Sequence, residues 1–219
     1  MRKLLLVSIL AVATSFAGII KIDGFADGQG PITAIGTNGP MVISDSDVLP
    51  PMSVSRTLEF APPAVDTPPV SRSMIVDSGV LDINHGTGEN TTARVIYALP
   101  QIVLPPAAIA STVELFLEIV QSDANPTNVQ VLLNGGSLGS FAIPGNTMNQ
   151  QVVFAVPSLV FGNPGTNSLV LEVTGANSYD ITLDSFGVQW STTPEPGTMV
   201  LVGLAISGLG LLRRRRPVA

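Results

Sequence analysis

Apolar and polar residues alternate with a period of two along several stretches of the chain, as half-buried β-strands require. In TVELFLEIV (112–120), the aliphatic residues at positions 113, 115, 117 and 119 share one face of a strand, and Glu114 and Glu118 share the other. The stretches TARVIYAL, NVQVLL, QVVFAV and NSLVLEVT behave alike. The residues that this pattern places on inward faces are Ala93, Val95, Tyr97, Leu99, Val113, Leu115, Leu117, Ile119, Val129, Val131, Leu133, Val152, Phe154, Val156, Leu169, Leu171 and Val173.

Shorter stretches predict further strands at Arg56–Phe60, Met74–Val76, Val80–Ile83 and Leu138–Ile143. No segment between the two chain ends has a 3.6-residue apolar period bounded by helix caps. The sequence therefore predicts an all-β domain of about nine or ten short strands.

Glycine, proline and asparagine separate these strands. Asn134-Gly135-Gly136, Pro144-Gly145-Asn146 and Asn163–Asn167 each predict a hairpin turn. Turns every eight to twelve residues are typical of a two-sheet sandwich, here of jelly-roll type.

The last apolar pattern, YDITLDSFGVQW, changes parity. Its apolar residues are odd up to Leu183 and even from Phe186 onward. One strand cannot keep both sets on one face without an extra residue, so we expect a β-bulge near Asp184-Ser185. Gly18 to Pro51 and the proline-rich stretch APPAVDTPPVSRS show the least regular pattern. We interpret the second as a long loop between strands.

The N-terminus, MRKLLLVSILAVATSFAG, has the order of features of a secretory signal peptide. A positive start precedes an apolar core, and the small residues Ser15 and Ala17 precede Gly18. We expect export by the Sec machinery and cleavage between Ala17 and Gly18, which makes residues 1–17 the signal peptide.

The C-terminus, TTPEPGTMVLVGLAISGLGLLRRRRPVA, combines an acid between two prolines, an apolar run and an arginine cluster. The run from Thr198 to Leu212 spans 15 residues, which as a helix reaches roughly 22 Å, short of a bilayer core of about 30 Å. We expect a short membrane helix over 198–212. Its cytoplasmic stop would be the four charges of Arg213, Arg214, Arg215 and Arg216.

Pro194-Glu195-Pro196, the apolar run and the arginines, in this order, resemble the PEP-CTERM sorting signal over 193–219. The resemblance implies a Gram-negative bacterium and processing by exosortase, a membrane-embedded enzyme similar to cysteine transpeptidases. It also implies an association with extracellular polysaccharide. The chain would be anchored in the membrane transiently and then reach the cell surface or matrix. A permanent tail anchor without processing is the alternative.

The part between the two signals, 18–192, forms a single domain in this interpretation. It has four basic residues against 15 acidic ones, a net charge of −11. Such a body repels nucleic acid, so nucleic-acid binding is excluded. The chain has no cysteine, so its stability must come from a hydrophobic core and not from disulfides.

Scattered pieces of the body resemble exported jelly-roll domains of the galactose-binding-like type. They are IDGF, SRTLEF, TTARVIYAL, NVQVLLNGGSLGSF and YDITLDSFGV. The resemblance concerns the fold and implies no activity.

Candidate catalytic groups are few. His85 is the only histidine, and we interpret it as a surface-loop residue. Glu114 and Glu118 share one face of a strand, but four residues separate them by roughly 13 Å, too far for a glycosidase pair. We therefore expect no enzyme activity and no catalytic residue.

Structural calcium remains open, because carboxylates in loops or at strand ends are suitable ligands. The candidates are Asp23, Asp27, Asp45, Asp47, Asp180 and Asp184. No ligand set can be assigned from the sequence.

A sugar-binding face would need exposed aromatic rings. We expect Tyr97, Tyr179, Trp190 and most phenylalanines to be core residues instead. Three classes of function remain: a non-catalytic surface or matrix protein associated with exopolysaccharide, a carbohydrate-binding module with a defined glycan, and a hydrolase. The first is our main interpretation and the second its alternative.

Overall fold

The computed structural model describes residues 16–48, 53–61, 71–104, 111–156 and 160–192. These residues form thirteen strands and no helix, which confirms the predicted all-β class. The strands are β1 (Phe16–Asp23), β2 (Gln29–Ile32), β3 (Gly36–Ile43), β4 (Val54–Ala61), β5 (Arg72–Asp77), β6 (Val80–His85), β7 (Thr92–Val103), β8 (Ser111–Ser122), β9 (Thr127–Leu133), β10 (Gly136–Ile143), β11 (Met148–Ala155), β12 (Val160–Gly175) and β13 (Ile181–Thr192).

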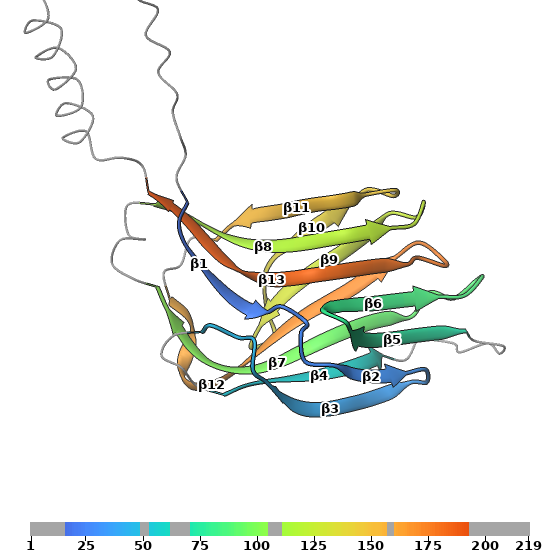
Figure 1. Ribbon diagram of the computed structural model, residues 1–219, viewed down its shortest axis with the longest axis horizontal. Coiled ribbons are helices and arrows are strands. Elements are labelled where there is room, and N and C mark those ends of the chain that lie inside the picture. Colours follow the sequence, from blue (N-terminus) through green and yellow to red (C-terminus); the bar gives the residue numbers. More distant parts are fainter. Residues whose placement is uncertain (1–15, 49–52, 62–70, 105–110, 157–159, 193–219) are drawn as a thin grey trace, which may run out of the picture.

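The strands build two antiparallel sheets packed face to face (Figure 1). Sheet A has the order β11-β8-β13-β6-β5-β2, and β1 also pairs with β13. Sheet B has the order β10-β9-β12-β7-β4-β3. The predicted sandwich is therefore confirmed.

The first and last strands lie side by side within sheet A. Phe16 of β1 is paired with Ser191 of β13, and the pairing continues to Asp23 and Phe186. On its other edge β13 pairs with β8 from Ile181 to Thr192. The start of β1 and the end of β13 consequently lie at the same end of the sandwich (Figure 1).

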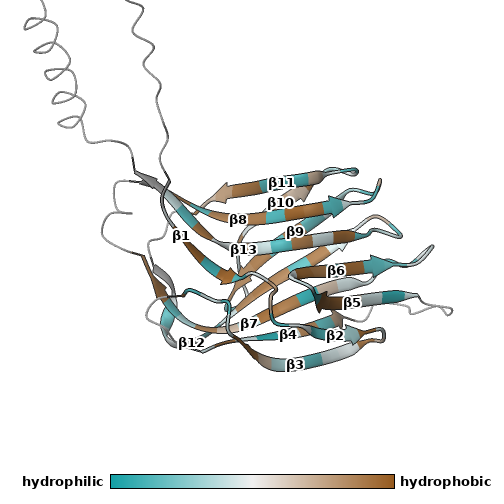
Figure 2. Cartoon of the chain, viewed as in Figure 1, coloured by the Kyte–Doolittle hydropathy of each residue, from teal (hydrophilic) through white to brown (hydrophobic). Residues whose placement is uncertain are grey.

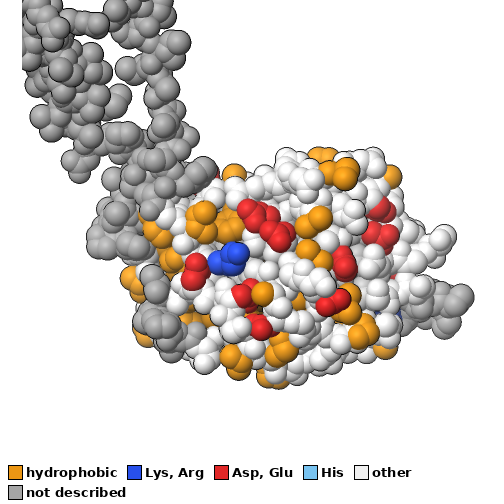
Figure 3. Space-filling model, viewed as in Figure 1, with side chains coloured by type: hydrophobic (Ala, Val, Ile, Leu, Met, Phe, Trp, Pro, Cys, Tyr) orange, Lys and Arg blue, Asp and Glu red, His pale blue; other side chains and the backbone are white. Residues whose placement is uncertain are grey.

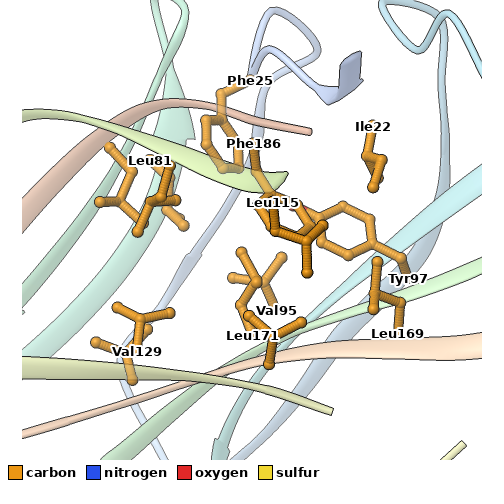
Figure 4. Close-up of a cluster of buried hydrophobic side chains, with 14 of the residues drawn as sticks. Ile22, Phe25, Leu81, Val95, Tyr97, Leu115, Val129, Leu169, Leu171 and Phe186 are labelled. Carbon is orange, nitrogen blue, oxygen red and sulfur yellow. The ribbon is translucent and has the colours of Figure 1, made fainter. Parts of the chain in front are cut away.

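The core lies between the two sheets and is made of the inward positions of the alternating strands. Figure 2 shows the resulting alternation of apolar and polar residues along β8 and β13. Tyr97 of sheet B stacks on Phe186 of sheet A, with ring centroids 6.2 Å apart, in the middle of the cluster in Figure 4. Most predicted inward residues are buried, whereas Leu133, Val152 and Phe154 are half-buried at its margin.

The predicted irregularity near Asp184-Ser185 is present. The pairing of β13 with β8 shifts register on both sides of Leu183. The shift lets Leu183 and Phe186, which differ in parity, both face the core.

One predicted hairpin is confirmed and two are wrong. Asn134 and Gly135 have φ angles of 50° and 82° and join β9 to β10 in the two-residue turn that such angles favour. Pro144-Gly145-Asn146 instead connects β10 of sheet B to β11 of sheet A. The chain crosses between the layers there, and Phe141 packs on Phe154 with ring centroids 4.6 Å apart.

Asn163–Asn167 lies inside the single strand β12 as a bulge. Pairing with β7 resumes at Thr166 after a register shift that follows Phe161. The Asn167 side chain closes the bulge, accepting from the Asn163 N–H at 2.7 Å and donating to the Asn163 carbonyl at 2.8 Å. Local hydrogen bonding by asparagine can thus serve a bulge as well as a turn.

The region with the least regular sequence pattern, Gly18 to Pro51, contains the strands β1, β2 and β3, each of which shifts register against its neighbour. β2 and β3 contain Pro31 and Pro40 and are edge strands of their sheets. Edge strands tolerate proline and need little alternation because one of their sides has no neighbour. Most of the proline-rich stretch 61–73 lies outside the described residues, so its interpretation as a loop stays a prediction.

Candidate functional site

The outer face of sheet A gathers polar and acidic side chains over β8 and β13 (Figure 3). Glu114 and Glu118 of β8 point outward, as predicted, because Leu115 and Leu117 point into the core. The register places Gln189 opposite Glu114 and Ser185 opposite Glu118. Each glutamate therefore has a hydrogen-bond donor on the next strand.

Both glutamates accept hydrogen bonds from these side chains. The Gln189 amide donates to Glu114 Oε2 at 3.1 Å, and the Ser185 hydroxyl donates to Glu118 Oε2. The Gln151 amide of β11 approaches Glu118 Oε1 at 3.5 Å. The two glutamates are thus held in separate hydrogen-bond networks.

Phe116 lies between the two glutamates and is only 2% exposed, although it is on the outer face. Its ring covers Gly187 of β13, where a Cβ atom would lie 2.7 Å from the ring. The glycine therefore makes room for the aromatic ring. Phe116 fills the middle of this face and leaves no exposed ring surface on which a sugar could stack.

Asp184 projects from the bulge of β13 beside Glu118. Burial raises the pKa of Asp184, and a hydrogen bond and charge repulsion from Glu118 raise it further, while Lys21 acts in the opposite direction. The bulge therefore places Asp184 where the Glu118 carboxyl acts on its pKa.

A groove of about 490 Å³ adjoins this carboxyl pair. We call it the acidic groove; it is lined by Glu118, Ile119, Val120, Asn149, Gln150, Gln151 and Asp184. Its polar groups are amides and carboxyls, which can accept and donate hydrogen bonds.

Two further hollows lie toward the ends of β5, β6 and β13. One of about 240 Å³ lies over Gln121 and Asp123, and one of about 420 Å³ lies over Ser71 and Arg72. They share Asn84 and Asp180. The polar surface of sheet A thus continues past the acidic groove.

His85, predicted as a surface-loop residue, is buried. It is the last residue of β6 and is 4% exposed. Its ring lies against Tyr179 at a centroid distance of 4.2 Å and meets Phe60 edge-on at 5.6 Å. The prediction was wrong because His85 shares parity with the inward residues Leu81 and Ile83, and this pattern could have revealed it.

The surroundings of His85 favour its neutral form. Burial lowers the pKa of His85, against the raising effects of the carboxylates of Glu89 and Asp180. Asp180 Oδ1 accepts the His85 backbone N–H at 2.7 Å. No described hydroxyl or carboxyl is hydrogen-bonded to the ring, so the described residues offer no Ser-His-Asp arrangement.

A buried ion pair that the sequence analysis missed joins the N-terminal segment to sheet B. Arg56 and Asp23 are both 0% exposed, and their side chains meet at 2.7 Å. Tyr97 donates its hydroxyl to Asp23 at 2.9 Å, and Arg56 Nε donates to Gln29 Oε1 at 2.9 Å. Burial raises the pKa of the Asp23 carboxyl, while Arg56 and the hydrogen bonds from Phe25 and Tyr97 lower it.

Arg72 forms a second inward ion pair, with Glu89 at 2.8 Å. It also donates to Thr91 at 2.8 Å. Both buried arginines share parity with the apolar residues of their strands. The alternating pattern therefore contained this information.

Three of the six aspartates considered as calcium ligands are held by different partners. Asp23 is in the buried ion pair, Asp27 accepts from Ser44, and Asp45 accepts from the Gly24 N–H at 2.6 Å. The remaining three are Asp47, Asp180 and Asp184. The part of the chain that the structure describes contains no group of three His, Asp or Glu side chains around one possible metal position.

The aromatic residues named in the sequence analysis are buried, as expected. Tyr97 and Tyr179 are 0% exposed and Trp190 is 6% exposed. The Tyr179 hydroxyl donates to the carbonyls of Thr91 and Val173, at 2.9 and 3.0 Å. Among the aromatic side chains that the structure describes, none is exposed enough to form a platform for a sugar ring.

The residues proposed to direct sorting lie outside the described part of the chain. This holds for Pro194, Glu195, Pro196, the apolar run 198–212 and the arginines 213–216. At the other end, the described residues include Ala17 and Gly18 but not 1–15. Within the described ranges, no helix is long and apolar enough to cross a membrane.

The solved structures that are similar to this chain include two carbohydrate-binding modules. The carbohydrate-binding module TmCBM61, in complex with beta-1,4-galactotriose, is 10% identical, with a TM-score of 0.34 over 61% of this chain and 86% of its own. The family 11 carbohydrate-binding module of the cellulosomal cellulase Lic26A-Cel5E of Clostridium thermocellum is 10% identical, with a TM-score of 0.31 over 82% and 97%. No curated protein matches the chain.

The C-terminal segment does match a family model. Residues 192–216 match the PEP-CTERM protein-sorting motif, which is the family that the order of triplet, apolar run and arginines predicted. The motif implies that the protein is exported, that its C-terminal segment anchors it in the membrane before processing, and that an exosortase processes it.

Proposed function

We propose that this chain is a non-catalytic protein of the cell surface or extracellular matrix, delivered by a PEP-CTERM/exosortase system and associated with extracellular polysaccharide. The sorting motif at 192–216 is the observation that supports this most directly. The signal peptide over 1–17 supplies entry into the export machinery.

The described residues supply reasons for assigning no catalysis. The only histidine is buried against Phe60 and Tyr179. Glu114 and Glu118 are held by different donors, Gln189 and Ser185. What the sandwich offers is a polar, acidic surface suited to binding.

In this proposal the tail works in three parts. Pro194, Glu195 and Pro196 are read by the exosortase, and the two prolines keep the motif extended and outside any helix. The apolar run holds it at the membrane, and Arg213 to Arg216 stop the chain on the cytoplasmic side.

The mass of the protein recovered outside the cell tests this proposal. We expect a species that begins at Gly18 and ends near the triplet. Glu195→Ala should leave the full-length precursor in the inner membrane, whereas Thr193→Ala, the adjacent control, should be processed normally. An exported protein that keeps Leu212 and the arginines would instead support a permanent anchor.

Carbohydrate binding with a defined glycan is the second candidate. The acidic groove favours it, because amide and carboxyl groups hydrogen-bond to sugar hydroxyls. The buried aromatic rings weigh against a stacking platform. Glycan-array binding by the exported protein, with and without calcium, tests this candidate; binding that Gln151→Ala and Asp184→Asn abolish would locate the ligand in the groove.

A further inference from the structure

Five strands are paired on one side only within the described residues: β1, β2, β3, β10 and β11. An unpaired edge can add a strand from another chain, and natural proteins interrupt such edges with proline, bulges or charges. β1, β2, β3 and β10 each contain glycine or proline or both, and each shows a register shift against its neighbour. These four edges are therefore interrupted.

β11 has none of these interruptions. Its sequence, MNQQVVFA, contains no charge, no proline and no glycine. Its pairing with β8 has no register shift, and after Asn149, which has a φ angle of 46°, it is continuous from Gln150 to Ala155. Met148 is 68% exposed and Val153 is 43% exposed. β11 therefore presents a straight, uncharged edge with apolar residues in contact with solvent.

From this contrast we propose that β11 is a self-association edge, and that its occupant is β11 of a second copy of this chain, paired antiparallel about a two-fold axis. The proposal goes beyond the proposed function and does not depend on it. Val153 lies next to the middle of the straight segment Gln150–Ala155. The two-fold axis that we propose passes beside Val153, so that this side chain faces its own copy.

Charge decides whether two acidic bodies can meet at this edge. Each body carries a net charge of −11, so two copies repel at most of their surfaces. At the β11 edge the nearest acids in sequence register are Glu114 and Glu118 on β8. Three strand spacings separate the two β8 strands, roughly 14 Å, which exceeds the Debye length of about 8 Å at physiological salt.

Pairing also covers apolar surface. Val153 lies beside the buried Phe116 in the register with β8, so a second Val153 would extend this apolar row. On the inward side, half-buried Phe154 packs on Phe141 at the margin of the core. Backbone hydrogen bonds supply the affinity of an added strand, and these side chains supply the match.

The chain has no cysteine. A chain with one introduced cysteine can therefore form a disulfide only with the same cysteine of a second copy. We expect Val153→Cys, in the exported protein, to form a disulfide-linked dimer under mild oxidation, whereas Gln151→Cys, which lies opposite Ala155 in the same pairing, should not. Val42→Cys is the matched control, because Val42 is 66% exposed on the interrupted edge β3. Equal cross-linking of the control would overturn the proposal.

Sedimentation velocity over a concentration series gives the second measurement. The exported protein should form dimers, and Val153→Lys should raise the dimer dissociation constant at least about tenfold, whereas Val42→Lys should leave it unchanged. Gln151→Lys replaces Val153→Lys if circular dichroism shows that the latter unfolds. A protein that stays monomeric at all soluble concentrations would overturn the proposal, and its processed mass would still report separately on the sorting proposal.

Discussion

Arg56 and Arg94 lie on neighbouring strands of sheet B and face opposite sides of it. Arg56, on β4, is 0% exposed and sits in the core, whereas the Arg94 side chain, on β7, is 36% exposed on the outer face. Both pair with carboxylates: Arg56 with Asp23 at 2.7 Å, and Arg94 with Glu172 at 2.8 Å. The same ion-pair chemistry thus occurs in two solvent environments.

The difference shows what a charge inside the sandwich requires. Around Arg56, Asp23 and Gln29 both accept hydrogen bonds and the Asp27 carbonyl accepts another. Water can replace the partners of Arg94 but not those of Arg56. An inward charge is therefore tolerated only with a complete set of partners, while an outward charge needs none.

The strongest test places an inward charge without any partner. Leu115→Asp puts a carboxylate at a core position that is 1% exposed, and we expect the domain to unfold because nothing there can neutralise it. Glu114→Gln, one position away and outward, should be nearly silent. Circular dichroism and urea unfolding distinguish the two, and equal effects would mean that the register is wrong.

Removing one partner of the buried pair should have the next largest effect. Arg56→Met leaves Asp23 buried without its counter-charge, which costs about 3–5 kcal/mol for pairs of this kind. The double variant Arg56→Met with Asp23→Leu should recover part of this loss, because neither charge then remains. A shift in urea midpoint no larger than that of a surface variant would contradict the role given to Arg56.

We expect a smaller effect from His85, a buried side chain whose surroundings favour its neutral form. Its pKa in the folded state lies below the unfolded value of 6.5 because of burial. Its contribution to stability is therefore present above pH 6.5 and is lost as the pH falls through the lowered folded value. The loss is about 1.4 kcal/mol for each unit by which the pKa is lowered.

The leucine side chain in His85→Leu does not titrate. This variant should therefore lose less unfolding free energy on acidification than the unmodified protein. Urea unfolding of both proteins above and below pH 6.5 measures it. If the two proteins lose stability in parallel on acidification, the histidine does not contribute.

The smallest effect is expected at Arg94. Exposed ion pairs contribute about 0–1 kcal/mol, so Arg94→Ala should barely move the urea midpoint, and added salt should reduce the difference further. A loss comparable to that of Arg56→Met would remove the contrast between the two arginines.

Much of the fold followed from the alternation of apolar residues. The inward faces of β7, β8 and β12 and the bulge in β13 were predicted because each depends on local parity alone. The edge strands β2 and β3 were missed, because a strand with one neighbour and one solvent-facing edge needs no strict alternation. The crossing at Pro144-Gly145-Asn146 was misread because turn chemistry does not say whether the chain stays in its sheet.

The polar interior was harder to predict. Parity placed Arg56, Arg72 and His85 inward, but charge and the usual exposure of these residue types suggested the opposite. The partner of Arg56, Asp23, lies 33 residues away along the chain, and the partner of Arg72, Glu89, lies 17 residues away. Only the folded arrangement brings them together, so no local pattern could identify them. The carboxyl pair Asp184–Glu118 likewise depends on the register between β13 and β8.

The place of β13 has a mechanical consequence. The chain continues from this strand into the sorting motif, and β13 has β8 along one edge and β6 and β1 along the other. A pull on the tail acts along the axis of β13, perpendicular to its hydrogen bonds to both neighbours. These bonds are then loaded together in shear and do not open one after another like a zipper. A domain attached through this strand can bear a load that an edge strand or a loop could not.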